Sequence, residues 1–203
     1  MEKDTYKTIS ESSKEVLFKA KGSKFFGYAF PVTSEEQISE YLEQLKKEHY
    51  NARHWCYAWQ LGKGYEKYRA NDDGEPSNSA GMPIYGQLQS FDCTNILLVV
   101  VRYFGGTKLG VGGLIQAYKT AAKMALDNST VRVRTINELF TLKFEYAVMN
   151  TVMRIIKDEN LTIKDQKMEL NCEITLSVRK KDANRIFAIF ENTYKIAIKR
   201  TDD

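Results

Sequence analysis

The stretch NILLVVVRYFGGTKLGVGGL, residues 95–114, is the part of the sequence that decides the fold. Its apolar residues 96–101 do not alternate with polar ones, which is typical of a strand buried on both faces or packed deep against helices. Five glycines follow within residues 105–113, and from Leu114 the apolar residues recur at the spacing of a core-facing helical stripe. This order predicts a central strand, a glycine-rich turn and a helix that begins at Leu114.

The glycine-rich turn is also a candidate binding site. Glycines allow positive φ and close backbone approach, and the helix N-terminus beyond them offers free N–H groups to an anion. Arg102 and Lys108 frame this corner with positive charge. The alternative is a tight turn that only lets strand and helix pack together. The candidate glycines are Gly105, Gly106, Gly110, Gly112 and Gly113.

The spacing of these glycines excludes two common nucleotide-binding motifs. Gly105 and Gly110 have the separation of a P-loop, but Val111 and Gly112 stand where Lys and Ser/Thr are required. A dinucleotide-binding turn starting at Gly110 would need glycine at the position of Ile115. We therefore expect neither ATP hydrolysis nor NAD binding by the usual routes.

The composition is that of an ordinary soluble protein with one large or two small domains. Of the 203 residues, 43% are hydrophobic and 28% charged, and the net charge of +4 is too small to indicate a strongly basic nucleic-acid module. No apolar run is long enough for a membrane span, and the first residues do not resemble a signal peptide. Three widely spaced cysteines, Cys56, Cys93 and Cys172, indicate neither a disulfide framework nor a zinc site. We expect a cytoplasmic protein without metal or cofactor.

The first part of the chain alternates between strand and helix patterns. Expected strands cover residues 15–20, 24–30, 54–61 and 65–70, and expected helices begin near residues 34 and 83. Gly22-Ser23 suits a glycine-first type II′ turn between the first two strands. Together with the helix after the glycines, these elements predict an α+β sandwich of three helices on one sheet, whose other face is less covered.

From Val131 the pattern changes to strand, helix, strand, strand, helix, strand. The expected strands are residues 139–147, 161–167, 170–178 and 194–199, and the helices are residues 151–159 and 182–193. This β-α-β-β-α-β order is that of the ferredoxin-like fold. We place the boundary near residues 128–135, which gives domains of residues 1–130 and 131–203.

A polar loop supplies the second candidate site. Asp72, Asp73 and Glu75 lie within four residues, together with Gly74 and Pro76. Neighbouring carboxylates serve as acid and base or as Mg²⁺ ligands. The alternative is turn chemistry, in which the side chains bond their own backbone.

Three motifs resemble the YigZ/IMPACT family: residues 72–76 (DDGEP), 80–84 (AGMPI) and 101–114 (VRYFGGTKLGVGGL). The resemblance spans nearly the whole chain and is strongest in these motifs. It implies an N-terminal IMPACT domain, similar to domain IV of elongation factor G with its ribosomal-protein-like α+β fold. It also implies that residues 132–203 correspond to the C-terminal domain of the bacterial YigZ branch, which resembles the ferredoxin-like domain V of the same factor.

The resemblance does not by itself supply a biochemical activity. Eukaryotic members are known as translational regulators that bind a scaffold protein in the amino-acid starvation response. The extra N-terminal domain of those members is not expected here, so that partnership is not carried over. For the bacterial branch the resemblance implies RNA or ribosome binding, which rests on fold analogy.

Two functional hypotheses follow. In the first and favoured one, the chain is a translation-associated binding protein rather than an enzyme. Its basic corner would contact RNA, the ribosome or an acidic protein surface through Arg53, His54, Arg69, Arg102 and Lys108, with the five glycines of the turn.

In the second hypothesis, the chain is a hydrolase of a small substrate. Asp72, Asp73 and Glu75 would then meet the glycine-rich turn in one cleft. Separately, His54 and Cys56 lie two residues apart on an expected strand and therefore share a face. His54 and Cys56 lack a second pair of ligands, so they do not indicate a metal site.

Overall fold

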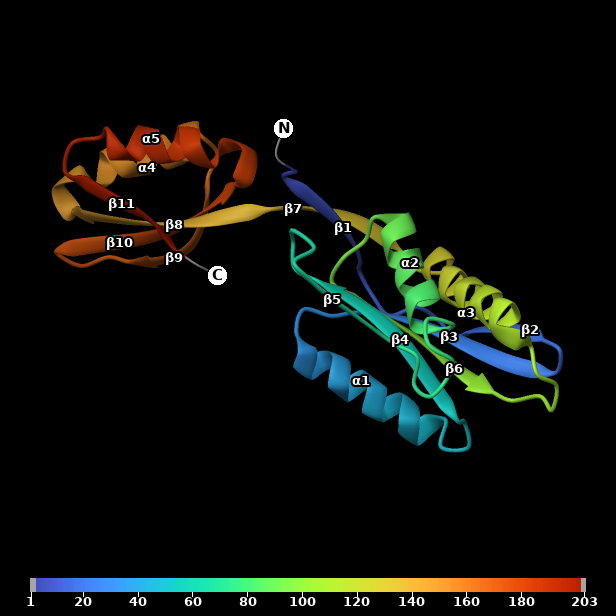
Figure 1. The fold of residues 1–203 in the computed structure, drawn as a ribbon. Coiled ribbons are helices and arrows are strands. Elements are labelled where there is room, and N and C mark those ends of the chain that lie inside the picture. The colour runs from blue at the N-terminus through green and yellow to red at the C-terminus, as the bar shows by residue number, and fades with distance from the viewer. Residues whose placement is uncertain (1–2, 202–203) are drawn as a thin grey trace. The chain divides into compact units, whose positions relative to one another are not determined.

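The computed structural model describes residues 3–201, which form two compact units (Figure 1). The first unit comprises residues 6–134. Of the described residues, the second comprises residues 135–201 together with residues 3–5. The N-terminal residues join the second unit through Asp4, whose carbonyl accepts from the Ile136 N–H at 2.8 Å and whose carboxylate accepts from Arg179 Nε at 2.7 Å. The predicted α+β class is confirmed. Among the described residues, no helix is both long and apolar enough to cross a membrane.

The first unit is built on a five-stranded antiparallel sheet with β6 at its centre. The strand order is β2-β3-β6-β4-β5, with β2 Val16–Ala20, β3 Ser23–Pro31, β4 His54–Leu61, β5 Lys67–Asn71 and β6 Ile96–Tyr103. Residues 96–102 of β6 are all buried, as the apolar run predicts. β6 is therefore the strand against which the rest of the unit packs.

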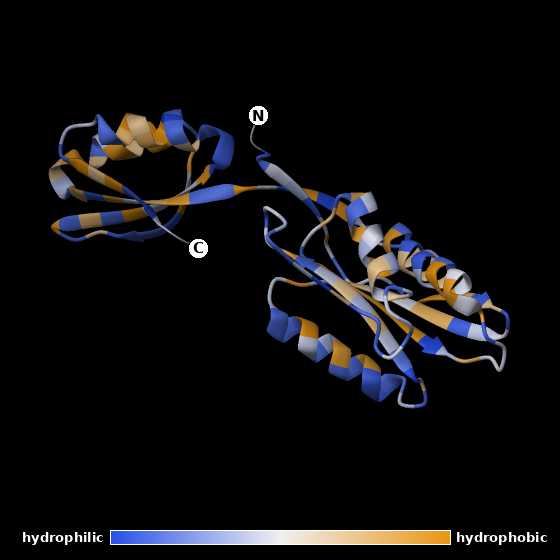
Figure 2. Cartoon of the chain, viewed as in Figure 1, coloured by the Kyte–Doolittle hydropathy of each residue, from blue (hydrophilic) through white to orange (hydrophobic). Residues whose placement is uncertain are grey.

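Helices cover both faces of this sheet (Figures 1 and 2). They are α1 Glu35–Glu48, α2 Gly81–Phe91 and α3 Gly110–Asp127. Helices α2 and α3 share a core with Val100, whereas α1 lies on the opposite face, where Ile38 and Leu45 share a core with Val99 and Val101. The expectation of a less covered second face was wrong. The unbroken apolar run from Ile96 to Val101 in β6 supplies both cores, and α1 covers the second.

Two local details also differ from the sequence-based expectations. The β2–β3 turn is Lys21-Gly22, with φ of 45° and 77°, and two positive φ angles make it a type I′ turn rather than type II′. Helix α3 begins at Gly110, four residues before Leu114, so the last glycines of the turn belong to its first turn.

A short two-stranded sheet also escaped the sequence analysis. It pairs β1 (Thr5–Ile9) with β7 (Val131–Thr135). β7 is exposed along its whole length, so its VRVRT sequence buries no apolar face that would mark it as a strand. Its partner lies more than a hundred residues earlier, where no local pattern points to it.

The second unit has the predicted ferredoxin-like architecture. Its antiparallel sheet has the order β11-β8-β10-β9, with β8 Asn137–Glu145, β9 Thr162–Lys167, β10 Asn171–Arg179 and β11 Ile196–Thr201. Helices α4 (Met149–Asp158) and α5 (Ala183–Glu191) are each preceded by a 3-10 turn, η1 (Tyr146–Val148) and η2 (Lys180–Asp182). Both helices lie over the same face of the sheet, which leaves the other face uncovered.

The close packing of α3 on β3 makes a testable prediction. A Cβ on Gly27 would lie 2.6 Å from the Ala121 carbonyl oxygen, which belongs to the α3 backbone. Gly27→Ala should therefore lower the free energy of unfolding by about 1–3 kcal/mol through overpacking. Gly86→Ala in α2 is the matched control, because its Cβ would meet nothing within 4 Å and alanine favours helix by about 0.5–1 kcal/mol. Urea unfolding of both variants checks this, and equal stabilities would contradict it.

Candidate functional site

The acidic loop folds back onto the end of the sheet where β6 leaves it, and Glu75 is its buried centre. Glu75 Oε1 accepts hydrogen bonds from Arg102 Nη1 at 2.6 Å and from the Tyr118 hydroxyl at 2.7 Å. Both side chains of the ion pair are buried. One carboxylate thus ties the loop to β6 and to α3.

Burial changes the role expected of Arg102. Arg102 was expected to frame an exposed basic corner. Instead, its guanidinium carbon lies 5.5 Å from the ring centres of both Phe25 and Phe104, and its charge is paired with Glu75. The reason is strand alternation, because Arg102 shares a sheet face with Val100 and points toward α3. Its charge is not available to a ligand on the surface.

The two aspartates of the loop hold backbone groups in place. Asp72 Oδ1 accepts from the N–H groups of Ala80 and Gly81 at 2.9 and 2.8 Å, at the start of α2, and its Oδ2 accepts from Asn78 N–H at 2.8 Å. Asp73 Oδ2 accepts from the Trp55 N–H at 2.7 Å. Asp72 therefore binds the backbone of its own loop, as the turn-chemistry alternative describes, whereas Asp73 binds the backbone of β4.

His54 lies at the partly exposed edge of this cluster. Its Nδ1 is 2.8 Å from the Asp73 carbonyl oxygen, and since a carbonyl only accepts, Nδ1 carries the proton. The other ring nitrogen, Nε2, lies 4.0 Å from Glu75 Oε1. The ring is thus held in one orientation beside a carboxylate that is already engaged by Arg102 and Tyr118.

The thiol next to His54 on the same face of β4 is not a nucleophile at neutral pH. Cys56 is buried and donates to the Asp72 carbonyl at 3.0 Å. Burial raises the pKa of the Cys56 thiol; a hydrogen bond with Tyr118 opposes this in part, and the nearby charges of Glu75 and Asp73 raise the pKa further. Burial likewise raises the pKa of Tyr118. Within residues 3–201, no group of three His, Cys, Asp or Glu side chains is arranged to hold a metal ion.

The glycine-rich turn is held against the tip of the β2–β3 hairpin. Gly105 N–H donates to Ser23 Oγ at 3.1 Å, and a Cβ on Gly105 would lie only 1.9 Å from the carbonyl carbon of Gly22. Further along the turn, Gly106 and Gly110 have φ of 86° and 74°, which favours glycine. Only glycine at position 105 allows the turn to lie this close to Gly22 of the hairpin.

This contact places the hairpin lysines next to the turn that carries Lys108. The Arg53 N–H donates to the Arg102 carbonyl at 3.5 Å, which puts Arg53 at the same end of the sheet. We call this surface the basic end; its residues are Lys19, Lys21, Lys24, Arg53 and Lys108. The hairpin supplies the first three, which the sequence analysis missed. The sequence does show that lysines flank the hairpin turn, but no local pattern shows that this turn contacts the glycine-rich turn.

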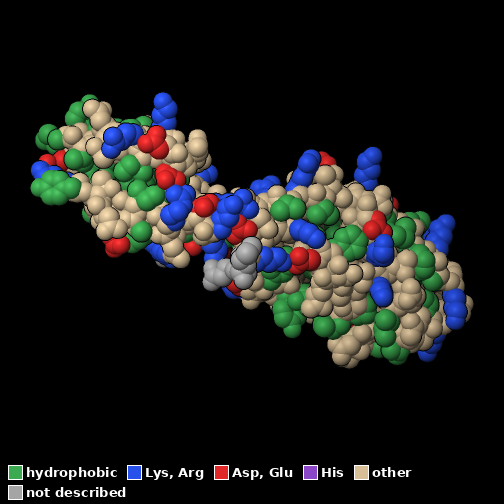
Figure 3. All heavy atoms as spheres, turned by 90° about the horizontal axis from the view of Figure 1, so that it is seen from above, with side chains coloured by type: hydrophobic (Ala, Val, Ile, Leu, Met, Phe, Trp, Pro, Cys, Tyr) green, Lys and Arg blue, Asp and Glu red, His purple; other side chains and the backbone are tan. Residues whose placement is uncertain are grey.

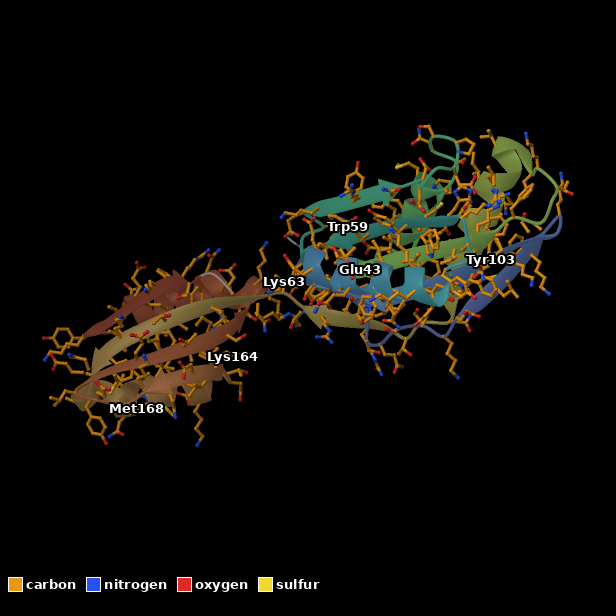
Figure 4. All side chains as sticks on the ribbon, turned by 90° about the horizontal axis from the view of Figure 1, so that it is seen from below. Glu43, Trp59, Lys63, Tyr103, Lys164 and Met168 are labelled. Carbon is orange, nitrogen blue, oxygen red and sulfur yellow. The ribbon has the colours of Figure 1, made fainter. Side chains whose placement is uncertain are left out.

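Arg69 does not join the basic end. It pairs with Trp59 on β4, five residues from His54, and therefore lies about 17 Å along the strand from the end that contains Arg102. Figure 4 looks onto the α1 face and labels Trp59 and, nearer the glycine-rich turn, Tyr103. Of the expected binding residues, Arg53, His54, Lys108 and the glycines lie near one another, while Arg102 is buried beneath them and Arg69 is apart.

The buried ion pair predicts a large loss of stability on removing one charge. Glu75→Gln leaves the buried Arg102 without a counter-charge and should lower the free energy of unfolding by about 3–5 kcal/mol. Tyr118→Phe removes only a hydrogen bond and should cost about 1–2 kcal/mol. The double variant Glu75→Leu, Arg102→Met should be more stable than Glu75→Gln alone. Urea unfolding measures all three, and equal effects of Glu75→Gln and Tyr118→Phe would contradict the pairing.

The raised pKa of Cys56 predicts protection from alkylation. At pH 8, iodoacetamide should leave Cys56 unmodified in the native protein and modify it in urea, as peptide mass spectrometry would show. The raised pKa also links the stability of the fold to pH. Because the pKa of Cys56 is higher in the folded chain than its unfolded value of 9.0, the contribution of Cys56 to the free energy of unfolding keeps its full value below about pH 9 and falls as the pH rises further. Labelling of native Cys56 at the rate of the unfolded chain would refute its burial.

The chain is similar to known proteins over most of its length. The family model described as the Impact N-terminal domain matches residues 21–126. The Bacillus subtilis protein "IMPACT family member YvyE" is 31% identical over 180 residues, which cover 89% of this chain and 82% of that protein. The Escherichia coli protein "IMPACT family member YigZ" is 36% identical over 133 residues, 64% of this chain and 65% of that protein.

A solved structure supports the fold independently. It is described as "Crystal structure of an hypothetical protein", is 24% identical, covers 99% of both chains and has a TM-score of 0.72. The range matched by the family model, residues 21–126, includes Glu75, Arg102, Tyr118 and the glycine-rich turn of this chain, and the match to YvyE extends over most of the chain. This chain belongs to the IMPACT family.

Proposed function

We propose that this chain is a translation-associated binding protein that contacts RNA, on the ribosome or free, through its basic end. The observation that carries the proposal is the backbone contact between Gly22 and Gly105. It brings the exposed hairpin lysines Lys21 and Lys24 beside Lys108. Phosphate groups are the main electrostatic partner of such lysine clusters.

The charges of the basic end are free to meet a ligand. Among the described residues, none of its five cations takes part in an ion pair. The buried carboxylate of Glu75 is neutralised by Arg102 and does not offset them. The surface at this end is therefore positive although the whole chain carries only +4.

The start of α3 adds backbone donors to the same surface. Its N-cap residue Leu109 makes no side-chain cap, and its first turn holds no acidic residue. The N–H groups at Gly110, Val111 and Gly112 are therefore available to an anion, and the dipole of an 18-residue helix favours negative charge there. No Cβ at Gly112 covers this backbone.

The hydrolase alternative has less support. Asp72 and Asp73 hold backbone N–H groups, Glu75 is paired with Arg102, and Cys56 is a buried, protonated thiol. These contacts stabilise the loop and the end of the sheet, and this structural role accounts for the residues without a catalytic one. The link to translation comes from the family, because its eukaryotic members are known as translational regulators.

The proposal predicts the effect of reversing one exposed charge. Lys108→Glu should weaken binding to ribosomes and to bulk RNA at low salt, and the salt dependence should become shallower because fewer counterions are released. Lys67→Glu is the matched control, because Lys67 is exposed on β5 at the opposite end of the sheet. Filter binding at two salt concentrations, with a thermal melt of each variant, gives the answer. Equal binding by wild type and Lys108→Glu would reject the basic end as the RNA contact and favour a protein partner.

A further inference from the structure

Large apolar side chains are exposed together at one end of the four-stranded sheet in the second unit. Leu170 is 88% exposed, Tyr194 81%, Tyr146 65% and Met168 42%. Figure 3 shows hydrophobic side chains gathered at the left edge of this unit, and Figure 4 labels Met168 at the same end. Clusters of this kind mark binding surfaces, because isolated proteins rarely leave several large apolar side chains together in water.

Strand pairing places these residues side by side. Phe144 of β8 pairs with Ile196 of β11, so Tyr146 and Tyr194 each lie two residues beyond that pair. The Tyr146 N–H donates to the Leu170 carbonyl at 3.3 Å, just before β10 begins. The four side chains thus surround the open end of the sheet rather than lying scattered over the unit.

An open hollow of about 590 Å³ lies at this end. Phe144 and Ile196 contribute apolar surface to it, while Lys143, Glu145, Asn171 and Lys195 line it with polar groups. An amide and a carboxylate beside an apolar wall offer hydrogen bonds to the edge of a flat heterocycle.

Lysines border the hollow and continue onto the uncovered face of the sheet. Lys195 Nζ lies 5.6 Å from the ring centre of Tyr194, and Lys143 Nζ is 3.0 Å from a Glu173 carboxylate oxygen. The pKa of Glu173 lies below its usual range because Lys143 donates to it, and the charges of Lys167 and Lys199 lower it further. Against Lys143, Lys167, Lys195 and Lys199 stand two acids, Glu173 and Glu145, so the lysines still outnumber the carboxylates at this end.

Exposed aromatic rings beside lysines are the combination that binds unpaired nucleotides. Bases stack on the rings, and lysines contact the phosphates between them. Lysine is depleted from the centres of protein–protein interfaces, whereas Lys143 and Lys195 line this hollow. Base-paired RNA cannot place its bases on such rings, because they are already stacked within the helix.

We propose that this end of the second unit binds single-stranded RNA, with bases stacked on Tyr146 and Tyr194 and phosphates held by Lys143 and Lys195. This inference deepens the proposed function and rests on it, since it names unpaired RNA as the partner and adds a second contact surface. The two surfaces lie in different units, so each is tested by its own variants.

The test uses the full chain and two fluorescent probes, a 12-nucleotide oligouridine and a 12-base-pair RNA duplex. The double variant Tyr146→Ser, Tyr194→Ser should bind the oligouridine at least about ten-fold more weakly, as expected from the loss of two stacking contacts. Its salt dependence should be unchanged because no charge is removed. Lys143→Gln should instead make the salt dependence shallower.

The matched control is Tyr68→Ser, because Tyr68 is 57% exposed but lies on β5 of the first unit, at the end of the sheet away from the basic end. It should bind the oligouridine as the wild type does, and the melts of all variants should coincide. Equal affinity of the double tyrosine variant and the wild type, or an equal loss for duplex and oligouridine, would overturn the inference while the Lys108→Glu result still stands. If the wild type binds neither probe nor ribosomes, the proposed function itself fails.

Discussion

A carboxylate buried between an arginine and a tyrosine is the contact on which the first unit depends. Glu75 receives hydrogen bonds from Arg102 and Tyr118 and thereby joins the 72–80 loop, the central strand β6 and helix α3 at one point. A buried charge without its partner is strongly destabilising, so each member of the centre requires the others. Asp72 and Asp73 extend the same constraint, because they bind the backbone at the start of α2 and in β4.

The charges of the first unit fall into two groups, those buried in ion pairs and those exposed at the surface. Arg102 lies within the most distinctive motif of the chain, yet its charge is used internally. The outward charges come instead from the β2–β3 hairpin and from Lys108, whose segments meet at the Gly22–Gly105 contact, and from Arg53 beside the end of β6. A buried ion pair thus lies beneath a set of exposed lysine side chains, an arrangement that suits phosphate binding without sequence selectivity.

Local patterns in the sequence were sufficient for much of the fold. The unbroken apolar run predicted β6, the helical stripe predicted α3, and the strand and helix order after Val131 predicted the ferredoxin-like unit. What escaped depends on contacts between distant residues. Glu75 lies 27 residues before Arg102, so its pairing, and with it the inward direction of Arg102, has no local signal. The same holds for the hairpin lysines, whose meeting with the glycine-rich turn joins segments about 80 residues apart, and for the pairing of β1 with β7.

The claim that RNA contacts the basic end is tested most directly by amide chemical shifts of the isotope-labelled protein during titration with single-stranded RNA. We predict that shifts in the first unit concentrate in residues 19–24, 53 and 105–113, while the acidic outer face of α1, which carries Glu36, Glu40 and Glu43, stays unchanged. Shifts confined to α1, or a titration that leaves residues 105–113 unmoved while RNA binds, would contradict the account.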